Sequence, residues 1–451
     1  MKKNNLINLS ISMMLLTAII FYLSGCKEDT PAEVDQVNKA PIEASSESGN
    51  LVTDWYNLQL DIIRKSDPSI PNGTIIRAFG YTGMGLYEAV RPGIKKSVSL
   101  SNLLYQMPPM PQSEENSNYS WPISANAAIA KLIAYFYPPA VVALNKSRLD
   151  SIENANNDQL KQDIEPAVFT RSQAFGRSIA DAIIAWSTTD NAVLSNTGYV
   201  PPVFPGAWVP TPPLFANAAT PYYGNTRPLL QENLQSVAPP LGIEYSEEKG
   251  CDFYNMVKDI YDLSKKLTED QRNTALFWND LGVGIGFSPA GHAVSILTQV
   301  LEKKDCNLET AAIAYAKTGM AQYDALIVCW KSKYTYNLLR PVTYIQKVID
   351  PSWLPLIPTP PHPEYPGAHS FITGAFMRTM TGLFGENYAF TDYTYQARFG
   401  GPRSYSSFDA IAKETGESRR YGGIHYTPST IAGLKYGREV GSRINDLQLK
   451  E

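Results

Sequence analysis

Apolar residues recur along this chain at the three-to-four-residue spacing of amphipathic helices. Three such faces are Ile75, Phe79, Leu86 and Val90; Phe175, Ile179, Ala182, Ile183 and Trp186; and Phe253, Met256, Val257, Ile260 and Leu263. Because residues at these spacings share one side of an α-helix, the pattern predicts helices that each bury one face. No convincing series of alternating strand-like segments lies between them. The sequence therefore predicts an all-α fold built from packed helix bundles.

The helical pattern stops between residues 199 and 240, where prolines and aromatic residues are dense. Proline at this density excludes a helix, and the aromatic residues argue against a floppy linker. We expect an ordered loop that ends an N-terminal helical half, residues 51–240, and joins it to a C-terminal half, residues 241–451. Long ordered loops often wall a functional site. The alternative for this loop is surface packing alone.

Residues 1–26 have the pattern of a targeting segment rather than of the fold. Lys2 and Lys3 precede an apolar stretch that ends in Leu23-Ser24-Gly25-Cys26. A transmembrane anchor is the alternative, but the apolar stretch is short for a bilayer. The pattern favours a bacterial lipoprotein signal peptide, with Cys26 as the lipidated first residue of the mature chain. Residues 27–50 are polar and small and predict a flexible tether.

These features predict an exported lipoprotein of the bacterial outer membrane, facing either the cell surface or the periplasm, with the lipid as its only membrane contact. Lys27-Glu28-Asp29 resembles the acidic export signal of surface lipoproteins. Lipidation of Cys26 leaves three cysteines, which allow at most one internal disulfide of undetermined pairing. They are Cys251, Cys306 and Cys329.

Length and charge narrow the class of protein only slightly. A chain of 451 residues is long enough for a large core and for two or more domains. Its formal net charge of -4 gives no general attraction to nucleic acid, so we expect no nucleic-acid partner. The oligomeric state is not specified. Any cluster of cationic residues is therefore a local feature with a local purpose.

Three short segments near the C-terminus supply such a cluster. They are Lys333-(six residues)-Arg340-Pro341, Pro366-Gly367-Ala368-His369 and Ser418-Arg419-(five residues)-His425. The chain has only four histidines, and two of them lie in these segments. A lysine offers a compact charge and each arginine a planar fork of donors, which together suit a tetrahedral oxyanion such as phosphate or vanadate.

The second segment precedes the apolar run from Phe371 to Phe376 and is expected to open a helix. Its first residues would then present free backbone N–H groups and the positive end of the helix dipole to an anion. Of the two imidazoles, one can bond the central atom of the oxyanion and the other can transfer a proton.

In this order and spacing, the segments resemble the signatures shared by vanadium-dependent haloperoxidases and the type 2 phosphatidic acid phosphatases. Those signatures are Lys-x6-Arg-Pro, Pro-Ser-Gly-His and Ser-Arg-x5-His. A weaker resemblance to the bacterial haloperoxidases extends over most of the mature chain. The segments that carry it are Trp330 before the lysine, Phe277-Trp278, Ser288-Pro289-Ala290-Gly291-His292 and His362-Pro363-Glu364-Tyr365-Pro366.

The resemblance implies an all-α fold with two four-helix bundles and a vanadate cofactor, whose site phosphate could also occupy. It implies that His425 is the metal ligand or the phosphatase nucleophile, that His369 is the acid–base partner, and that Lys333 polarises bound peroxide. The cofactor pocket would contain Lys333, Arg340, Gly367, Ala368, His369, Arg419, Trp330 and His362. For His362 the alternative is a surface-loop histidine, and His292 is expected to cap or pack a helix.

Two positions depart from the family pattern. Gly367 stands where the signature has serine, so one hydroxyl contact to the oxyanion is missing. Ser429 stands where many relatives carry an aspartate four residues after the histidine, which would act on the imidazole from outside the site.

The preferred interpretation is a vanadium-dependent haloperoxidase that uses hydrogen peroxide to oxidise a halide, iodide or bromide. The export signal, Trp330 and the aromatic-rich loops favour it. One alternative is a vanadium-free acid phosphatase of the type 2 phosphatidic acid phosphatase superfamily, which would hydrolyse a phosphate ester through a phosphohistidine. Another is a non-catalytic surface lipoprotein, against which the complete set of cage residues argues. The organic acceptor is not specified.

Overall fold

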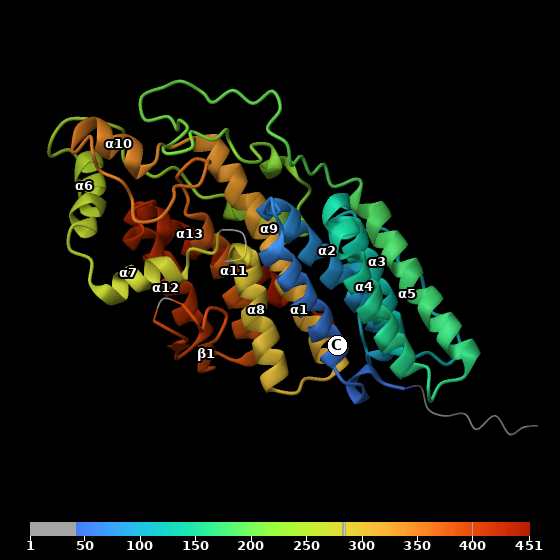
Figure 1. Ribbon diagram of the computed structural model, residues 1–451. Helices are drawn as coiled ribbons and strands as arrows, with labels where there is room; N and C mark the ends of the chain where they lie inside the picture. Colours follow the sequence, from blue (N-terminus) through green and yellow to red (C-terminus); the bar gives the residue numbers. More distant parts are fainter. Residues whose placement is uncertain (1–41, 282–283, 285, 399) are drawn as a thin grey trace, which may run out of the picture. The chain divides into compact units, whose positions relative to one another are not determined.

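The computed structural model describes residues 42–281, 284, 286–398 and 400–451 (Figure 1). The predicted signal peptide, Cys26 and most of the predicted tether lie outside these residues. The helices are α1 (Asn50–Lys65), α2 (Asn72–Val90), α3 (Trp121–Phe136), α4 (Pro139–Leu160), α5 (Pro166–Ser187), α6 (Asp252–Ser264), α7 (Glu269–Phe277), α8 (Ser288–Lys303), α9 (Leu308–Tyr336), α10 (Pro341–Val348), α11 (Ala368–Phe384), α12 (Phe408–Tyr421) and α13 (Thr427–Asp446). Short 3-10 helices are η1 (Ala44–Ser46), η2 (Arg91–Gly93), η3 (Leu100–Asn102), η4 (Tyr223–Asn225) and η5 (Gln231–Ser236).

The predicted all-α class is confirmed. The described residues add one small antiparallel pair of strands, β1 (Phe390–Asp392) and β2 (Arg403–Tyr405). Each strand has three residues, too few to show the alternation by which a strand is recognised in a sequence.

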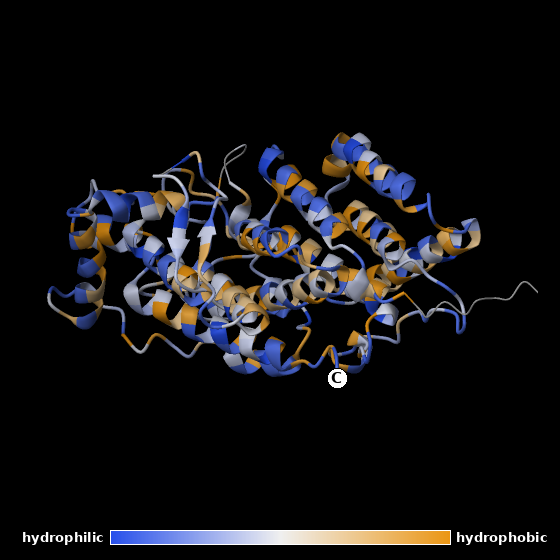
Figure 2. Ribbon diagram, turned by 90° about the horizontal axis from the view of Figure 1, so that it is seen from below, coloured by the Kyte–Doolittle hydropathy of each residue, from blue (hydrophilic) through white to orange (hydrophobic). Residues whose placement is uncertain are grey.

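The predicted apolar faces lie on α2, α5 and α6, and most of their residues are buried. The prediction that each helix buries a single face is wrong for α2, in which every residue from Ala78 to Val90 is buried because other helices surround it. Ala182 and Leu263 are partly exposed, at the edges of their faces. Figure 2 shows that most helices carry both hydrophilic and hydrophobic residues, as expected of amphipathic helices.

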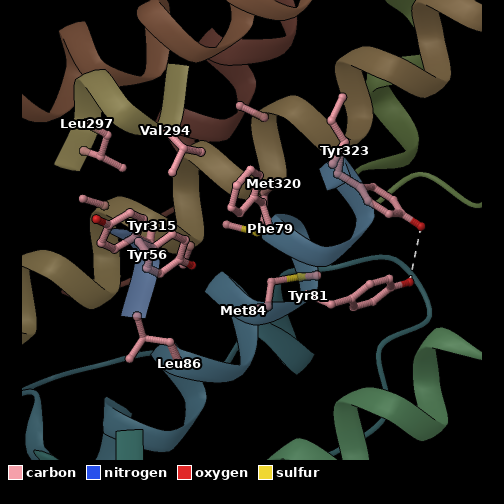
Figure 3. Close-up of a cluster of buried hydrophobic side chains, with 14 of the residues drawn as sticks. Tyr56, Phe79, Tyr81, Met84, Leu86, Val294, Leu297, Tyr315, Met320 and Tyr323 are labelled. Atoms are coloured by element: carbon pink, nitrogen blue, oxygen red, sulfur yellow. Dashed lines mark hydrogen bonds between the residues drawn. The ribbon is translucent and has the colours of Figure 1, made fainter. Parts of the chain in front are cut away.

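The long helix α9 joins the two predicted halves in one core. It packs against α2 in the N-terminal half and against α11 in the C-terminal half. Tyr56 of α1 stacks on Tyr315 of α9 with ring centroids 3.5 Å apart, and the hydroxyls of Tyr81 and Tyr323 lie 3.3 Å apart (Figure 3). The main hydrophobic cluster thus runs from Ala44 to Leu449 and spans residue 240, while a second cluster lies within the C-terminal half and contains the apolar face of α6.

The predicted tether is shorter than expected at its C-terminal end. Ala44 is fully buried, and Ser48 pairs with Asn307 as an isolated β-bridge. The Gly49 N–H donates to the Cys306 carbonyl at 3.0 Å. The polar composition concealed this attachment because main-chain groups and one small apolar side chain make it.

Two helices of the C-terminal bundle approach each other unusually closely. Along α13, Gly433, Gly437 and Gly441 face α11, and a Cβ on Gly437 would lie 2.1 Å from the Phe371 carbonyl oxygen. Only glycine permits this approach. This close contact places the first turn of α11, where the second signature ends, beside the start of α13, where the third signature ends.

The proline-rich segment is an ordered loop, as predicted. Trp330 Nε1 donates to Thr220 Oγ1 at 2.9 Å, and the Tyr334 hydroxyl donates to the Ala219 carbonyl at 2.6 Å. Further along, the carboxylate of Asp324 accepts from the main chain of Leu229 and Leu230. The loop is therefore tied to α9 on the side where Lys333 lies.

The three cysteines within the described residues, Cys251, Cys306 and Cys329, are free thiols. Cys329 is buried, as its apolar surroundings in the sequence indicate. None of the helices in the described part of the chain is both long enough and apolar enough to cross a membrane.

Candidate oxyanion site

The fold brings the three predicted segments to one place. Lys333 lies in the last turn of α9, Arg340 caps α10, His369 is in the first turn of α11, Arg419 is near the end of α12, and His425 directly precedes the cap of α13. All five side chains are buried. The site is thus assembled from five helix ends.

The two arginines hold the two histidines. Arg340 Nη1 lies 3.2 Å from His425 Nε2, and Arg419 Nη1 lies 3.1 Å from His369 Nε2. Because a guanidinium can only donate, both Nε2 atoms are acceptors and carry no proton. Each ring therefore presents a lone pair within the cationic cluster. Lys333 Nζ donates to the carbonyls of Pro363 and Glu364, both at 2.9 Å.

None of the three cations is paired directly with a carboxylate in the described part of the chain, although the buried Glu364 and Asp280 lie near enough to oppose the lowering of their pKa values. Among the described residues, no salt bridge within 4.0 Å involves Lys333, Arg340 or Arg419. Burial lowers the pKa of Lys333 to about 7 and the pKa values of Arg340 and Arg419 to about 10. Buried charges are normally paired, so this donor set fits a multiply charged oxyanion such as vanadate or phosphate.

The start of α11 offers fewer free backbone N–H groups to an anion than the sequence indicated. The Gly367 N–H is already engaged, because it donates to the Ser429 carbonyl at 3.0 Å. The prediction that Gly367 offers its N–H to an anion is therefore wrong. The Ala368 N–H has no acceptor among the described residues and remains suited to this purpose. The helix opens at Gly367, as predicted.

His425 is held on its other side by a carboxylate that the sequence did not reveal as functional. Its Nδ1 lies 2.7 Å from Glu364 Oε1, and both side chains are fully buried. Burial, followed by the charges of Arg340 and Lys333, keeps the pKa of His425 well below its usual value. The ring is therefore neutral.

His369 has a different electrostatic environment. Its Nε2 lies 3.7 Å from Asp280 Oδ2, in the segment between α7 and α8. Burial and then Arg419 lower the pKa of His369 to about 4, against the opposing effect of Asp280. An anion in the cage would offset the charge of Arg419 and raise this pKa, which suits a residue that takes up and releases a proton.

His292 packs in α8, stacked on Trp278 with ring centroids 4.4 Å apart, but it is also part of an ionic cluster. Its Nδ1 lies 2.8 Å from Asp280 Oδ1 and its Nε2 lies 2.7 Å from Asp392 Oδ2. Burial opposes its charge, but the two carboxylates outweigh burial and raise the pKa of His292 to about 10. The sequence prediction of simple packing missed this charge because Asp280 and Asp392 are distant in sequence.

A cavity of about 220 Å³ opens onto the two site histidines. Trp330 and His362 lie in its wall, and the proline-rich loop adds Ala219 and Thr220. The alternative of surface packing alone for this loop is thereby excluded. His362 is buried rather than on a surface loop, with its ring 5.0 Å from that of Trp330. Its Nδ1 lies 3.0 Å from Arg340 Nη2 and 3.2 Å from the Pro363 carbonyl oxygen.

Comparison with known proteins places this site in a recognised architecture. Residues 314–450 match the family model described as the VCPO second helical-bundle domain. The structure of a bacterial vanadium-dependent iodoperoxidase is similar to this chain with a TM-score of 0.79 and 29% sequence identity, covering 89% of this chain and 96% of that one.

Two structures of bacterial vanadium-dependent chloroperoxidase are similar in fold. The holo form matches with a TM-score of 0.63 and 16% identity over 84% of this chain and 93% of that one. The apo form matches with a TM-score of 0.63 and 15% identity over 86% and 99%. No curated protein sequence matches the chain. The helical architecture is thus that of the bacterial vanadium haloperoxidases.

Proposed function

We propose that this chain is a vanadium-dependent haloperoxidase that uses hydrogen peroxide to oxidise a halide, iodide or bromide. The observation that carries the proposal is the set of three buried cations that make no direct salt bridge within the described residues, grouped around an unprotonated His425 Nε2. The similarity to a bacterial iodoperoxidase over most of both chains supports it.

The residues that would hold vanadate are those of the cage. His425 offers the Nε2 lone pair to the central atom, while Lys333, Arg340, Arg419 and the Ala368 N–H face its oxygens. When bound, vanadate supplies a Lewis-acidic centre that activates hydrogen peroxide toward a halide. Phosphate has the same shape and can occupy the same donors.

The reaction consumes hydrogen peroxide, one halide ion and one proton, and yields hypohalous acid and water. His369 lines the cavity, and its pKa, which a bound anion would raise from about 4, suits it to take up and return a proton. Lys333 places its positive charge where negative charge on oxygen must be stabilised. Trp330 and the proline-rich loop limit the access of water to this point.

Hydrolysis of a phosphate ester is the competing function, since the cage does not distinguish phosphate from vanadate. In that case His425 Nε2 would attack phosphorus and His369 would protonate the leaving alcohol. Gly367, which replaces the serine of the signature, removes one contact to the oxyanion in either reaction. A non-catalytic surface lipoprotein is the remaining alternative.

The test is peroxide-dependent iodide and bromide oxidation by vanadate-loaded protein, beside hydrolysis of a phosphate ester by vanadate-free protein. We expect halide oxidation that requires vanadate and is lost in His425→Ala, which should also lose vanadate binding. His369→Ala should lose turnover and keep part of the binding. Ester hydrolysis without halide oxidation at saturating vanadate would identify a phosphatase, and neither activity would favour the non-catalytic alternative.

We also propose that the protein is exported and anchored to the bacterial outer membrane through a lipid on Cys26. The sequence pattern of residues 1–26 supports this proposal. Hydrogen peroxide and halide are both small solutes, so a site of this kind can work outside the cytoplasm.

A further inference from the structure

Glu364 is a buried carboxylate between α10 and α11 that makes no salt bridge to any of the three cations within the described residues. Its Oε1 accepts from His425 Nδ1 at 2.7 Å and from the Tyr426 N–H at 2.9 Å. Its Oε2 accepts from the Ser429 hydroxyl at 2.5 Å. All three donors lie directly before α13 or in its first turn, so the whole carboxylate is directed at the residues around His425.

The two sides of the His425 ring require the same tautomer. Arg340 Nη1 faces Nε2 and can only donate, so Nε2 must be unprotonated. Glu364 Oε1 faces Nδ1 and, as a carboxylate oxygen, can only accept, so Nδ1 must carry the proton. The ring is thereby fixed with its lone pair toward the cage. In neutral histidine without such contacts, both tautomers are populated and the ring can turn.

We propose that Glu364 is the positioning residue of the site: it holds His425 in the tautomer and orientation in which Nε2 can bond the central atom of the oxyanion. Ser429 completes the arrangement by fixing the second carboxylate oxygen. The chain thus supplies from the segment before α11 the carboxylate that many relatives are expected to carry four residues after the histidine. This inference rests on the proposed vanadate site and identifies the residue that orients its ligand histidine.

The Glu364 backbone serves the same site, which strengthens the assignment. Its carbonyl accepts from Lys333 Nζ at 2.9 Å, and its N–H donates to the Leu338 carbonyl at 2.8 Å. One residue therefore fixes a cation of the cage and the ligand histidine together. A carboxylate with a merely structural role has no need of the ligand ring as its partner.

The test uses Glu364→Gln, which keeps the shape and one acceptor but removes the charge. Outer hydrogen-bond partners of metal-ligating histidines commonly contribute 10–100-fold in affinity. We expect vanadate to bind Glu364→Gln about 10–100-fold more weakly, measured by equilibrium dialysis with vanadium analysis. Nitrogen-15 NMR of histidine-labelled, vanadate-free protein should show His425 protonated on Nδ1 in the parent. Because Arg340 still donates to Nε2, the variant should keep this tautomer but show a shifted Nδ1 resonance, since the hydrogen bond to a carboxylate becomes one to a neutral amide. With four histidines in the chain, the signal can be assigned from His425→Ala.

Asp324→Asn is the matched control. Asp324 is also a fully buried carboxylate that accepts from two backbone N–H groups and one side chain, those of Leu229, Leu230 and Asn233, but it lies outside the cage. It should lower thermal stability without changing vanadate affinity or the His425 signal.

Unchanged vanadate affinity and an unchanged His425 Nδ1 resonance in Glu364→Gln would overturn the positioning role. The positioning role would also be overturned if Asp324→Asn weakened vanadate binding as much as Glu364→Gln does. The tautomer is measured without vanadate, peroxide or halide. A parent protein that shows the Nδ1-protonated His425 and binds vanadate but oxidises no halide would therefore refute the proposed function and leave this inference standing.

Discussion

Gly367 is the residue at which the site departs most from its signature, and the structure allows the missing serine to be restored. Its backbone, with φ -65° and ψ 112°, is open to any residue. An added Cβ would lie 3.3 Å from the Ser429 carbonyl oxygen and 3.4 Å from Ser370 Oγ, a tight but adjustable fit. Serine is also a favoured N-cap for the helix that begins here.

We expect Gly367→Ser to tighten vanadate binding by about tenfold or more, because one hydrogen bond to a charged group contributes about 1.5–3 kcal/mol. The measurement is a vanadate titration of halide oxidation. Gly367→Ala is the control, since it adds the same Cβ without a hydroxyl and should bind no more tightly than the parent. Equal tightening in both variants would show that helix stability, rather than the hydroxyl, is responsible.

Residue types with a characteristic spacing were predictable in this site, and isolated carboxylates were not. The short signatures identify five site residues from the sequence alone: Lys333, Arg340, Arg419 and the two histidines. Glu364 and Asp280 are common residue types whose partners are 61 and 89 positions away, for His425 and His369 respectively. Only the folded chain brings them to the imidazoles. The sequence segment that contains Glu364 was noticed, but for its resemblance rather than for this carboxylate.

At the scale of elements, the contact between α11 and α13 sets the distance between the two site histidines. Gly437→Ala would place a methyl group 2.1 Å from the Phe371 carbonyl oxygen, so the helices must separate. Glycine-to-alanine changes in a helix ordinarily stabilise by about 0.5–1 kcal/mol. Overpacking of this kind typically costs about 1–3 kcal/mol, so we expect net destabilisation.

Separation of the helices should also weaken vanadate binding, since His369 lies two residues from Phe371. Urea unfolding and vanadate dialysis measure the two effects. Ile431→Ala, on the exposed side of the same helix, should change neither by much. A Gly437→Ala protein as stable as the parent would mean that the helices do not approach as closely as described.

The cluster of His292, Asp280 and Asp392 joins α8 to β1 and to the segment beside His369, and its contribution should depend on pH. The pKa of His292 is raised from 6.5 to about 10, so between these values the folded state holds a proton that the unfolded state has lost. Its stabilisation is therefore complete below about pH 6.5 and disappears as the pH rises through about 10. On the acid side, His292 and His369 overcome burial and lower the pKa of Asp280 to about 2, so its contribution is lost as the pH falls from 3.8 through that value.

We expect His292→Gln to lower the free energy of unfolding by about 3 kcal/mol at pH 6.5, as for other broken buried ion pairs. The loss should be much smaller at pH 10. The readout is the difference between parent and variant in urea unfolding at each pH. That difference is necessary because Lys333, with its lowered pKa, changes the stability of both proteins in the opposite direction. A loss that does not vary with pH would mean that His292 is neutral.

Element positions followed from periodicity where a helix has one buried side, as in α5 and α6. Periodicity did not predict the strands β1 and β2 or the attachment of residues 42–49, because backbone hydrogen bonds to distant residues create these features. In the whole molecule, the all-α class was likewise predictable. The packing of α9 against α2 in one half and α11 in the other was not, since most of this helix is buried and its sequence has no amphipathic pattern.

The last expectation concerns the chain as an exported protein. If Cys26 is the lipidated residue, Cys26→Ala should release the protein from the membrane fraction and abolish labelling by a radioactive fatty acid. The described body, residues 42 to 451, contains every residue of the proposed site, so the released protein should retain its full vanadate affinity and turnover. Cys306→Ala is the control, because it removes another free cysteine and should leave both lipid labelling and membrane association unchanged. A Cys26→Ala protein that is still labelled and membrane-bound like the parent would show that the segment before it is an uncleaved anchor, or that another cysteine carries the lipid.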